Sequence, residues 1–376
     1  MNRIILIGNG FDLAHDLKTK YEHFIDWFWE QEIKKIIWTV PKNAEQSCKY
    51  ENDYFTITAN SNYNFRNSNI KNFKELKEKI RITNQTYGSP TKVISFNITN
   101  KFLQQIQNNI TIQNWVDIEE EYYNALKSII NKKIKLAGGV VYANIDELNT
   151  YFSQIKKELE KYLTTINHKL EEYRIDFPNK EMFEQIYSEE KEIDYFLFLN
   201  FNYTSTHKFY DYNERYVGRE TSNISSIQIH GNLRDKNNPI IFGYGDELDD
   251  DYKIILKKND NKLLDNIKSV KYAETDNYKR LLNFIESDKY QIFIIGHSCG
   301  NSDRTLLNTL FENKNCQSIK IFYREWYEKD INGKEIKKDN FSEIYRNIMR
   351  NFTKFAELRA KVDDKTNSKK IPQFPS

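Results

Sequence analysis

Short apolar runs at both ends of the chain predict strands that are buried on both faces. The first run spans residues 3–7 and lacks the strict alternation of a half-exposed strand. Similar runs return after residue 190, at 195–199, 226–229, 240–242, 291–295 and 318–322. Amphipathic stretches at 281–286 and 305–312 lie between the later runs and predict helices. This alternation is typical of a parallel sheet covered by helices on both sides, and it predicts an α/β fold.

The part of the chain between these strands is expected to be mostly helical. Helical spacing of apolar residues occurs at 12–36, 70–80, 100–136, 144–174 and 182–186, whereas much of 41–100 is polar, Asn-rich and irregular. The first strand has no sheet partner nearby in sequence. We therefore predict one α/β domain made of residues 1–40 and 192–345, interrupted by a mostly helical insertion at 41–191.

The C-terminal part, 346–376, is expected to hold the end of a helix and then a disordered tail. After about Val362 the sequence is rich in Lys, Asn and Pro, a composition that cannot bury enough apolar surface to fold by itself.

Composition excludes several classes of protein. The net charge is +2, with 56 basic and 54 acidic residues, so a nucleic-acid partner is not expected. Three isolated cysteines exclude a disulfide framework and a four-cysteine zinc module, and six histidines show no metal-ligand spacing, so we expect no metal. No apolar run is long enough to span a bilayer, and the N-terminus lacks a signal-peptide pattern. We expect a cytoplasmic protein without a membrane partner.

The most informative motif follows the first strand, where Gly8-Asn9-Gly10-Phe11-Asp12 stands at the start of a helical pattern. Glycines in such a turn let a phosphate approach the backbone closely. The dinucleotide fingerprint needs a third glycine, and Leu13 stands in its place. The alternative is an ordinary tight turn between strand and helix, with Asp12 as the helix N-cap.

Three later strand runs also end in polar clusters, and ligands of open α/β sheets bind at the carboxyl ends of strands. We therefore expect these clusters to form one site together with the first turn. They are Asn200 to Thr204, His230-Gly231-Asn232, and Gly296-His297-Ser298 with Asn301, Ser302 and Asp303.

The order of these motifs resembles the sirtuin-like NAD-binding fold, and the chain resembles the AbiH family of bacteriophage abortive-infection proteins more closely. The AbiH resemblance reaches from the N-terminus to about residue 325. It is carried by IGNGFDLA at 7–14, WVDIE at 115–119, FNYT at 201–204, IHG at 229–231, FGYGDE at 242–247 and GHS at 296–298.

The resemblance implies an antiphage defence protein that has NAD or a related nucleotide as ligand or substrate. It implies that His230 is a catalytic base, that Asn202 positions the ribose and the attacking water, and that Ser298 lies near the adenosine side. Together with neighbouring positions, the expected ligand-binding residues are Gly8, Asn9, Gly10, Phe11, Asp12, His15, Tyr203, Thr204, Gly231, Gly296, His297, Ser298 and Asp303.

The expected chemistry is hydrolysis of the nicotinamide–ribose bond. This bond breaks through an oxocarbenium-like state with a leaving group that is already cationic, so a base and a water-positioning amide suffice. A histidine and an asparagine have these properties. Protein deacetylation is disfavoured because the zinc module of deacetylating sirtuins cannot be built here. The alternatives are a nucleotide sensor without catalysis and an interaction protein with a vestigial pocket. Further expected partners are a phage-derived trigger, a partner protein and a second copy of the chain.

Two acidic clusters leave alternatives open. Asp117 and Glu119, after Trp115, suit the first turn of a helix, or they close the site from the insertion. The loop at 246–251 carries five acidic residues and is either a solvated loop or a Mg²⁺ site.

Overall fold

The computed structural model divides the chain into two compact units. It describes residues 1–39, 48–59, 70–87, 93–113, 117–131, 134–172, 179–187, 193–211, 223–233, 235–245 and 247–373. We call Met1–Thr19 with Leu163–Ser376 the core unit, and Lys20–Tyr162 the inserted unit. The limits of the insertion expected from the sequence were 41 and 191. The first observed limit lies instead in the short segment before α2 (Tyr21–Thr39), and the second lies within helix α6 (Ile145–Glu172), which continues from one unit into the other without a change in composition.

The core unit is built on a six-stranded parallel sheet, which confirms the α/β prediction. The strand order is β11-β8-β7-β1-β5-β6. The bounds are β1 Asn2–Ile7, β5 Phe196–Asn200, β6 Ile224–Gln228, β7 Tyr290–Ile295, β8 Cys316–Tyr323 and β11 Lys369–Lys370. From β6 to β8 this is the order of a doubly wound sheet, and the direction of winding reverses between β1 and β7. The carboxyl ends of β1 and β7 are therefore the expected position of a site.

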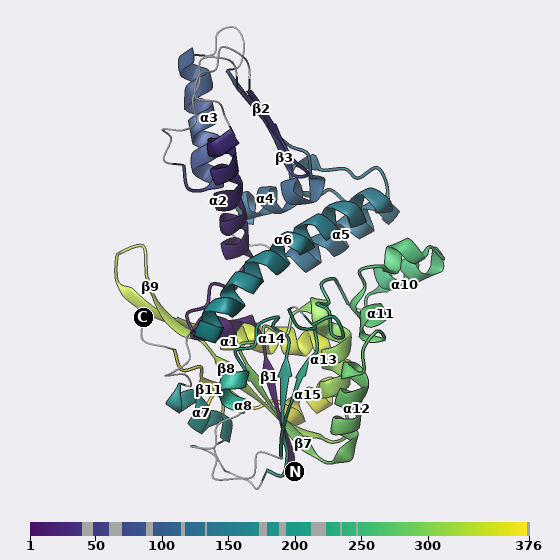
Figure 1. The fold of residues 1–376 in the computed structure, drawn as a ribbon. Coiled ribbons are helices and arrows are strands. Elements are labelled where there is room, and N and C mark those ends of the chain that lie inside the picture. Colours follow the sequence, from purple (N-terminus) through teal and green to yellow (C-terminus); the bar gives the residue numbers. More distant parts are fainter. Residues whose placement is uncertain are drawn as a thin grey trace. The chain divides into compact units, whose positions relative to one another are not determined.

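Helices cover both faces of this sheet, as the continuous apolar strands require (Figure 1). Ile4 and Leu6 of β1 pack into one buried cluster with α12, α13, α14 and α15, whereas Ile5 and Ile7 pack into a second cluster with α1, α7 and α8. The bounds are α1 Asn9–Ala14, α7 Lys180–Tyr187, α8 Lys208–Asp211, α12 Asn277–Ser287, α13 Arg304–Phe311, α14 Phe341–Asn351 and α15 Phe355–Lys361. Because successive side chains of a strand point to opposite faces, one apolar strand serves two cores.

Where it is described, the segment between β6 and α12 carries short helical elements rather than a strand. These are α10 Asp250–Lys257, the 3₁₀ helix η4 Asn261–Leu264 and α11 Lys268–Tyr272. The predicted strand at 240–242 is wrong: these residues form a buried loop, in which the Ile241 amide donates to the His230 carbonyl at 2.7 Å. Burial alone had produced the strand-like apolar pattern.

The C-terminal residues 363–373 follow an ordered course, contrary to the expectation from composition. Lys369 and Lys370 pair in parallel with Phe322 and Tyr323 of β8, and Ile371 is buried. An edge strand supplies backbone partners that the composition does not reveal. Between β8 and this strand lies an antiparallel hairpin, β9 Glu325–Lys329 with β10 Glu335–Asp339.

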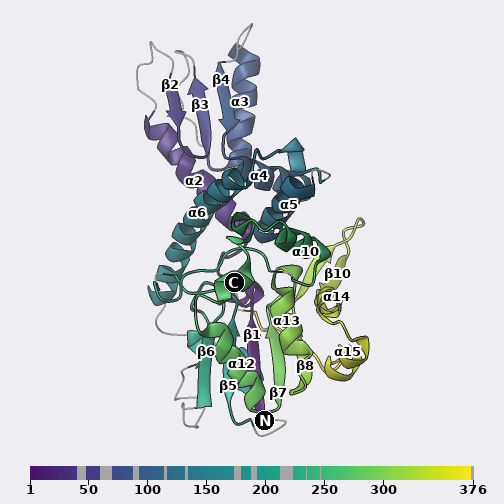
Figure 2. The same ribbon diagram turned by 90° about the vertical axis from the view of Figure 1, so that its right-hand side faces the viewer.

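The inserted unit combines helices with a small antiparallel sheet that the sequence analysis missed (Figure 2). The strand order is β2-β3-β4, and exposure alternates along β3, as expected for a half-buried strand. Trp29 stacks on Phe73 at 4.3 Å between ring centroids and also contacts Phe55 of β3. The elements are α2 Tyr21–Thr39, β2 Cys48–Glu51, β3 Phe55–Ala59, α3 Phe73–Tyr87, β4 Ile94–Ile98, α4 Lys101–Gln113, α5 Ile118–Asn131, the 3₁₀ helix η2 Ala137–Gly139 and the first part of α6.

The helical pattern at 12–36 corresponds to two helices. Helix α1 ends at Ala14, Asp16 has a left-handed φ of 57°, and α2 starts at Tyr21. The amphipathic pattern continues across this break, so the pattern alone predicted one continuous helix.

Candidate functional site

The turn after β1 packs directly against the turn after β7. The Gly10 amide donates to the Gly296 carbonyl at 2.7 Å, and the Gly8 amide donates to the Ile295 carbonyl at 3.3 Å. A Cβ on Gly10 would lie 2.8 Å from the Cα of Gly296, and one on Gly8 would lie 2.6 Å from the Cα of His297. The close approach of two backbones therefore requires these glycines, and their amides are bonded within the protein.

Helix α1 presents Asp12 to the interior. Gly8 is the N-cap, so the alternative that Asp12 caps the helix is wrong. The Thr204 hydroxyl donates to Asp12 Oδ2 at 2.6 Å. Burial raises the pKa of Asp12 to about 6, although hydrogen bonds from Thr204, Thr206 and Asn202 oppose the rise. A carboxyl group with this pKa carries charge at neutral pH at a cost in stability.

Three other residues expected near the ligand have structural contacts in the same region. Phe11 is buried in the core beside Tyr210. His15 contacts the Phe11 carbonyl with Nδ1 at 2.7 Å and the Tyr210 hydroxyl with Nε2 at 2.6 Å, and burial lowers the pKa of His15 to about 4. Asn9 is exposed and accepts a hydrogen bond from Thr19.

The end of β5 is tied to the end of β1. The Asn202 side-chain amide donates to the Gly8 carbonyl at 3.0 Å, and the Tyr203 hydroxyl donates to the Ile241 carbonyl at 2.9 Å. The structure thus brings Asn202 beside the first turn, as expected from its position at the end of a predicted strand.

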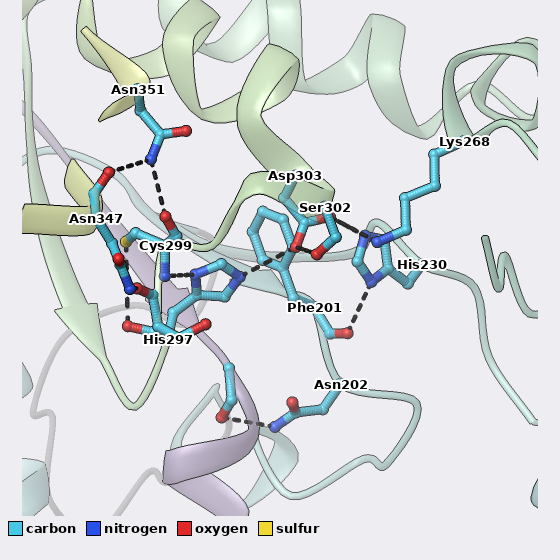
Figure 3. A network of polar contacts seen from close by, with 12 residues as sticks. Phe201, Asn202, His230, Lys268, His297, Cys299, Ser302, Asp303, Asn347 and Asn351 are labelled. Atoms are coloured by element: carbon cyan, nitrogen blue, oxygen red, sulfur yellow. Dashed lines mark hydrogen bonds and ion pairs between the residues drawn. The ribbon is translucent and has the colours of Figure 1, made fainter. Parts of the chain in front are cut away.

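His230 follows β6 and is the centre of a buried polar network (Figure 3). Its Nδ1 lies 3.1 Å from the Phe201 carbonyl, and its Nε2 lies 3.1 Å from the Tyr272 hydroxyl and 3.0 Å from Asp303 Oδ1. Burial and the charge of Lys268 lower the pKa of His230 and outweigh the opposite effect of Asp303. The next residue, Gly231, has a φ of +82°, and a Cβ there would collide with the Pro239 carbonyl.

Asp303 links this histidine to two further groups. The Lys268 ammonium donates to Asp303 Oδ1 at 2.8 Å, and His297 Nε2 lies 3.6 Å from Oδ2. Lys268 is only 1% exposed, and its charge together with His230 holds the pKa of Asp303 well below its usual range despite burial. Figure 3 shows the Asp303 carboxylate between the two imidazoles.

The turn that follows β7 carries His297 and leads to Asp303. Gly296 has a φ of +74° and Cys299 a φ of 55°. The Cys299 amide donates to His297 Nδ1 at 3.0 Å, so this nitrogen carries no proton. Ser298 is exposed, and its carbonyl accepts a hydrogen bond from Asn347 of α14.

A pocket of about 450 Å³ adjoins this network within the core unit. Lys268, Tyr272 and Asp303 form part of its wall. The Tyr272 ring is nearly parallel to the His230 ring and to the Tyr278 ring, with interplanar angles of 11° and 12°. The other lining residues are Gly245, Glu247, Ser269, Ala273, Thr275, Lys279, Ser302, Thr305 and Leu306. The site therefore combines a buried histidine, a charged pair and an aromatic wall.

Comparison with known proteins identifies the family. The family described as "Bacteriophage abortive infection AbiH" matches residues 4–325, most of the chain. The chain belongs to the AbiH family. No curated protein and no solved structure matches it. Membership of AbiH implies a role in phage abortive infection.

Of the residues expected to bind a ligand in this AbiH chain, Asp303 lines the pocket, and His230 reaches it through Tyr272 and Asp303. Gly8 and Gly10 instead pack against the backbone of the turn after β7. Lys268, Tyr272 and Tyr278 were not predicted from the sequence. One signal lay in the FGYGDE motif, because a Cβ on Gly245 would lie 3.1 Å from the Lys268 Cβ, so a small residue there leaves room for that lysine.

The two acidic clusters have local explanations where they are described. Asp117 accepts from the amides of Glu119 and Glu120 at the start of α5, which agrees with the helix-start alternative. Asp249 caps α10 in the same way, accepting from the Asp251 amide. Trp115 and Asp246 lie outside the described residues. Across the described ranges, His, Cys, Asp and Glu side chains form no group of three or more that could hold a metal ion.

The AbiH chain was also expected to lack a membrane partner. Among the helices that the structure describes, none combines the length and apolar character needed to cross a membrane.

Proposed function

We propose that this AbiH protein binds NAD or a related nucleotide in the pocket beside His230 and hydrolyses the nicotinamide–ribose bond during abortive infection. The observation that supports this proposal is a buried histidine whose Nε2 lies 3.0 Å from a pocket-lining carboxylate. A perturbed titratable group beside a pocket, at the carboxyl edge of a doubly wound sheet, is a candidate for ligand chemistry.

The nucleotide fits the pocket better than the first turn. A pyrophosphate on the β1 turn would need free amides, and those of Gly8 and Gly10 donate to the carbonyls of Ile295 and Gly296. The pocket offers two tyrosine rings, several hydroxyl groups and the Lys279 ammonium. Aromatic rings and a few placed polar groups are what small-ligand pockets provide. We therefore assign the ligand to the pocket and not to the Gly8–Gly10 turn.

His230 is suited to accept a proton. We assign the proton of the neutral imidazole to Nδ1, which donates to the Phe201 carbonyl, and Nε2 is then the basic atom. In this tautomer Nε2 accepts from the Tyr272 hydroxyl and lies 3.0 Å from Asp303 Oδ1. When Nε2 takes a proton from water or a ribose hydroxyl, it becomes a donor to the Asp303 carboxylate, which stabilises the imidazolium. This is the arrangement of a base with an orienting carboxylate.

The proposal is tested by incubating the full chain with NAD, alone and with lysate from phage-infected cells, and measuring nicotinamide. We expect release, and a loss of about 10²-fold or more in His230→Gln. His168→Gln is the matched control, because His168 is an exposed histidine of α6 within the core unit. Release that is absent in every condition, or unchanged in His230→Gln, would refute hydrolysis.

A specific observation favours a second candidate, a nucleotide sensor without catalysis. His230 is only 4% exposed, and the β1 turn is closed by its own hydrogen bonds. Such a pocket would hold a ligand and report its presence to a partner protein or a second copy of the chain. Calorimetry separates the candidates: binding of NAD without nicotinamide release favours the sensor, and binding that Lys279→Ala and Tyr278→Ala do not weaken contradicts both.

A further inference from the structure

Helix α14 lies beyond the residues that the AbiH family matches, yet it contacts the turn between His297 and Asp303. The match ends at residue 325, and α14 spans Phe341–Asn351. Ile344 and Ile348 bury one side of the helix in the core. Asn347 and Asn351 are four positions apart and therefore share a face.

These two asparagines donate to consecutive backbone carbonyls. Asn347 Nδ2 donates to the Ser298 carbonyl at 2.8 Å, and Asn351 Nδ2 donates to the Cys299 carbonyl at 2.9 Å (Figure 3). Asn351 Nδ2 also donates to the Asn347 carbonyl at 2.8 Å, and Asn351 is fully buried. Two carbonyls of one turn are thus fixed by one helix.

The turn needs such support because its backbone is strained. Cys299 has a φ of 55°, a backbone conformation that residues other than glycine rarely adopt. Residues in such conformations persist where the surrounding structure over-determines them. The hydrogen bonds from α14 hold the two carbonyls that flank this strain.

The conformation of Cys299 sets the state of His297. The Cys299 amide donates to His297 Nδ1, so the proton of the neutral imidazole lies on Nε2. That nitrogen lies 3.6 Å from Asp303 Oδ2, whereas Oδ1 faces Lys268 and His230. The asparagines are therefore connected to Asp303 through one backbone segment and one histidine ring.

We infer that Asn347 and Asn351 are positioning residues that hold His297 in its Nε2–H form and Asp303 against His230. The inference rests on the proposed function only for the expectation that the network serves a ligand. The arrangement of these side chains can be measured without turnover. It extends the site into a helix that the family match does not include.

The test is NMR of the full chain with ¹⁵N-labelled histidine imidazoles, which distinguishes the two neutral tautomers. His297→Gln assigns the His297 signals. We expect the Nε2–H tautomer in the unmodified chain and a shift toward a mixture in Asn347→Leu and in Asn351→Leu, together with a changed His230 titration. The control is Ile348→Val, which disturbs the packing of α14 without removing an amide.

Unchanged His297 signals in a folded Asn347→Leu would overturn the inference, and so would the same change in Ile348→Val. If Asn351→Leu does not fold, the less buried Asn347 decides the outcome. Asn347→Gln, which keeps an amide donor, should restore part of the original tautomer population. Failure of the unmodified chain to release nicotinamide would refute hydrolysis and leave this result unaffected.

Discussion

The Nε2 atom of His230 lies 3.0 Å from Oδ1 of Asp303, and the Lys268 ammonium bonds to the same oxygen at 2.8 Å. One carboxylate oxygen of Asp303 therefore contacts both the buried Lys268 ammonium and the titratable His230 ring at the edge of a pocket. The charge of Asp303 stabilises Lys268 permanently and would stabilise His230 whenever that ring is protonated.

We predict that Asp303→Asn destabilises the core unit by about 3–5 kcal/mol, because it removes the carboxylate that pairs with the buried Lys268 ammonium. Urea unfolding followed by circular dichroism measures the loss. Asp250→Asn removes the exposed partner of Lys253 and should change stability by less than about 0.5 kcal/mol. Equal stability of both variants would show that the Lys268 charge is not buried as described.

We predict that Asp12→Asn changes how stability depends on pH. The folded-state pKa of Asp12 is raised from 3.8 to about 6, so the folded protein binds the extra proton between these values. The contribution of Asp12 to stability is therefore lost as pH rises through this window, by up to about 3 kcal/mol. Asp12→Asn should gain stability relative to the unmodified chain between about pH 4 and about pH 7. A difference that is the same at every pH would contradict the prediction.

We predict that Gly10→Ala destabilises the protein by about 1–3 kcal/mol, because the new methyl group would meet the Gly296 backbone at 2.8 Å. Thermal unfolding should shift down by about 2–4 °C for each kcal/mol. Gly300→Ala is the control, since its Cβ would lie 3.6 Å from the Ser298 hydroxyl in ordinary contact. A stable Gly10→Ala with weakened nucleotide binding would instead favour a phosphate at this turn.

We predict that Tyr272→Phe raises the pKa of His230, because the neutral ring loses the hydrogen bond that Nε2 accepts. Loss of one hydrogen bond, about 1 kcal/mol, should change the protonation equilibrium of His230 roughly 5-fold. NMR titration of the His230 imidazole measures this effect. Tyr278→Phe removes a hydroxyl from the same pocket and should leave the His230 titration unchanged. A His230 titration that is equal in both variants would argue against this hydrogen bond.

Local sequence patterns predicted much of the fold. The apolar runs at β1, β5, β7 and β8 predicted buried parallel strands because strands covered on both faces need apolar residues at every position. The same criterion failed at 240–242, where a buried loop has the same composition, and it missed β3, whose alternating exposure lies in an Asn- and Thr-rich segment. A buried segment is apolar whether or not its backbone pairs with a neighbouring strand, so an apolar run alone does not identify a strand.

The sequence by itself determined the family, the parallel α/β core and the gathering of His230, Asn202, His297 and Asp303 at one edge of the sheet, because strand ends with polar residues must meet where parallel strands end. Only the tertiary structure decided what those residues contact. Gly8 and Gly10 face another backbone rather than open space, and Lys268 and Asn351, distant in sequence, complete the network. Periodicity and motif order describe the backbone locally, whereas pairing of buried charges and close backbone contacts depend on side chains brought together by packing.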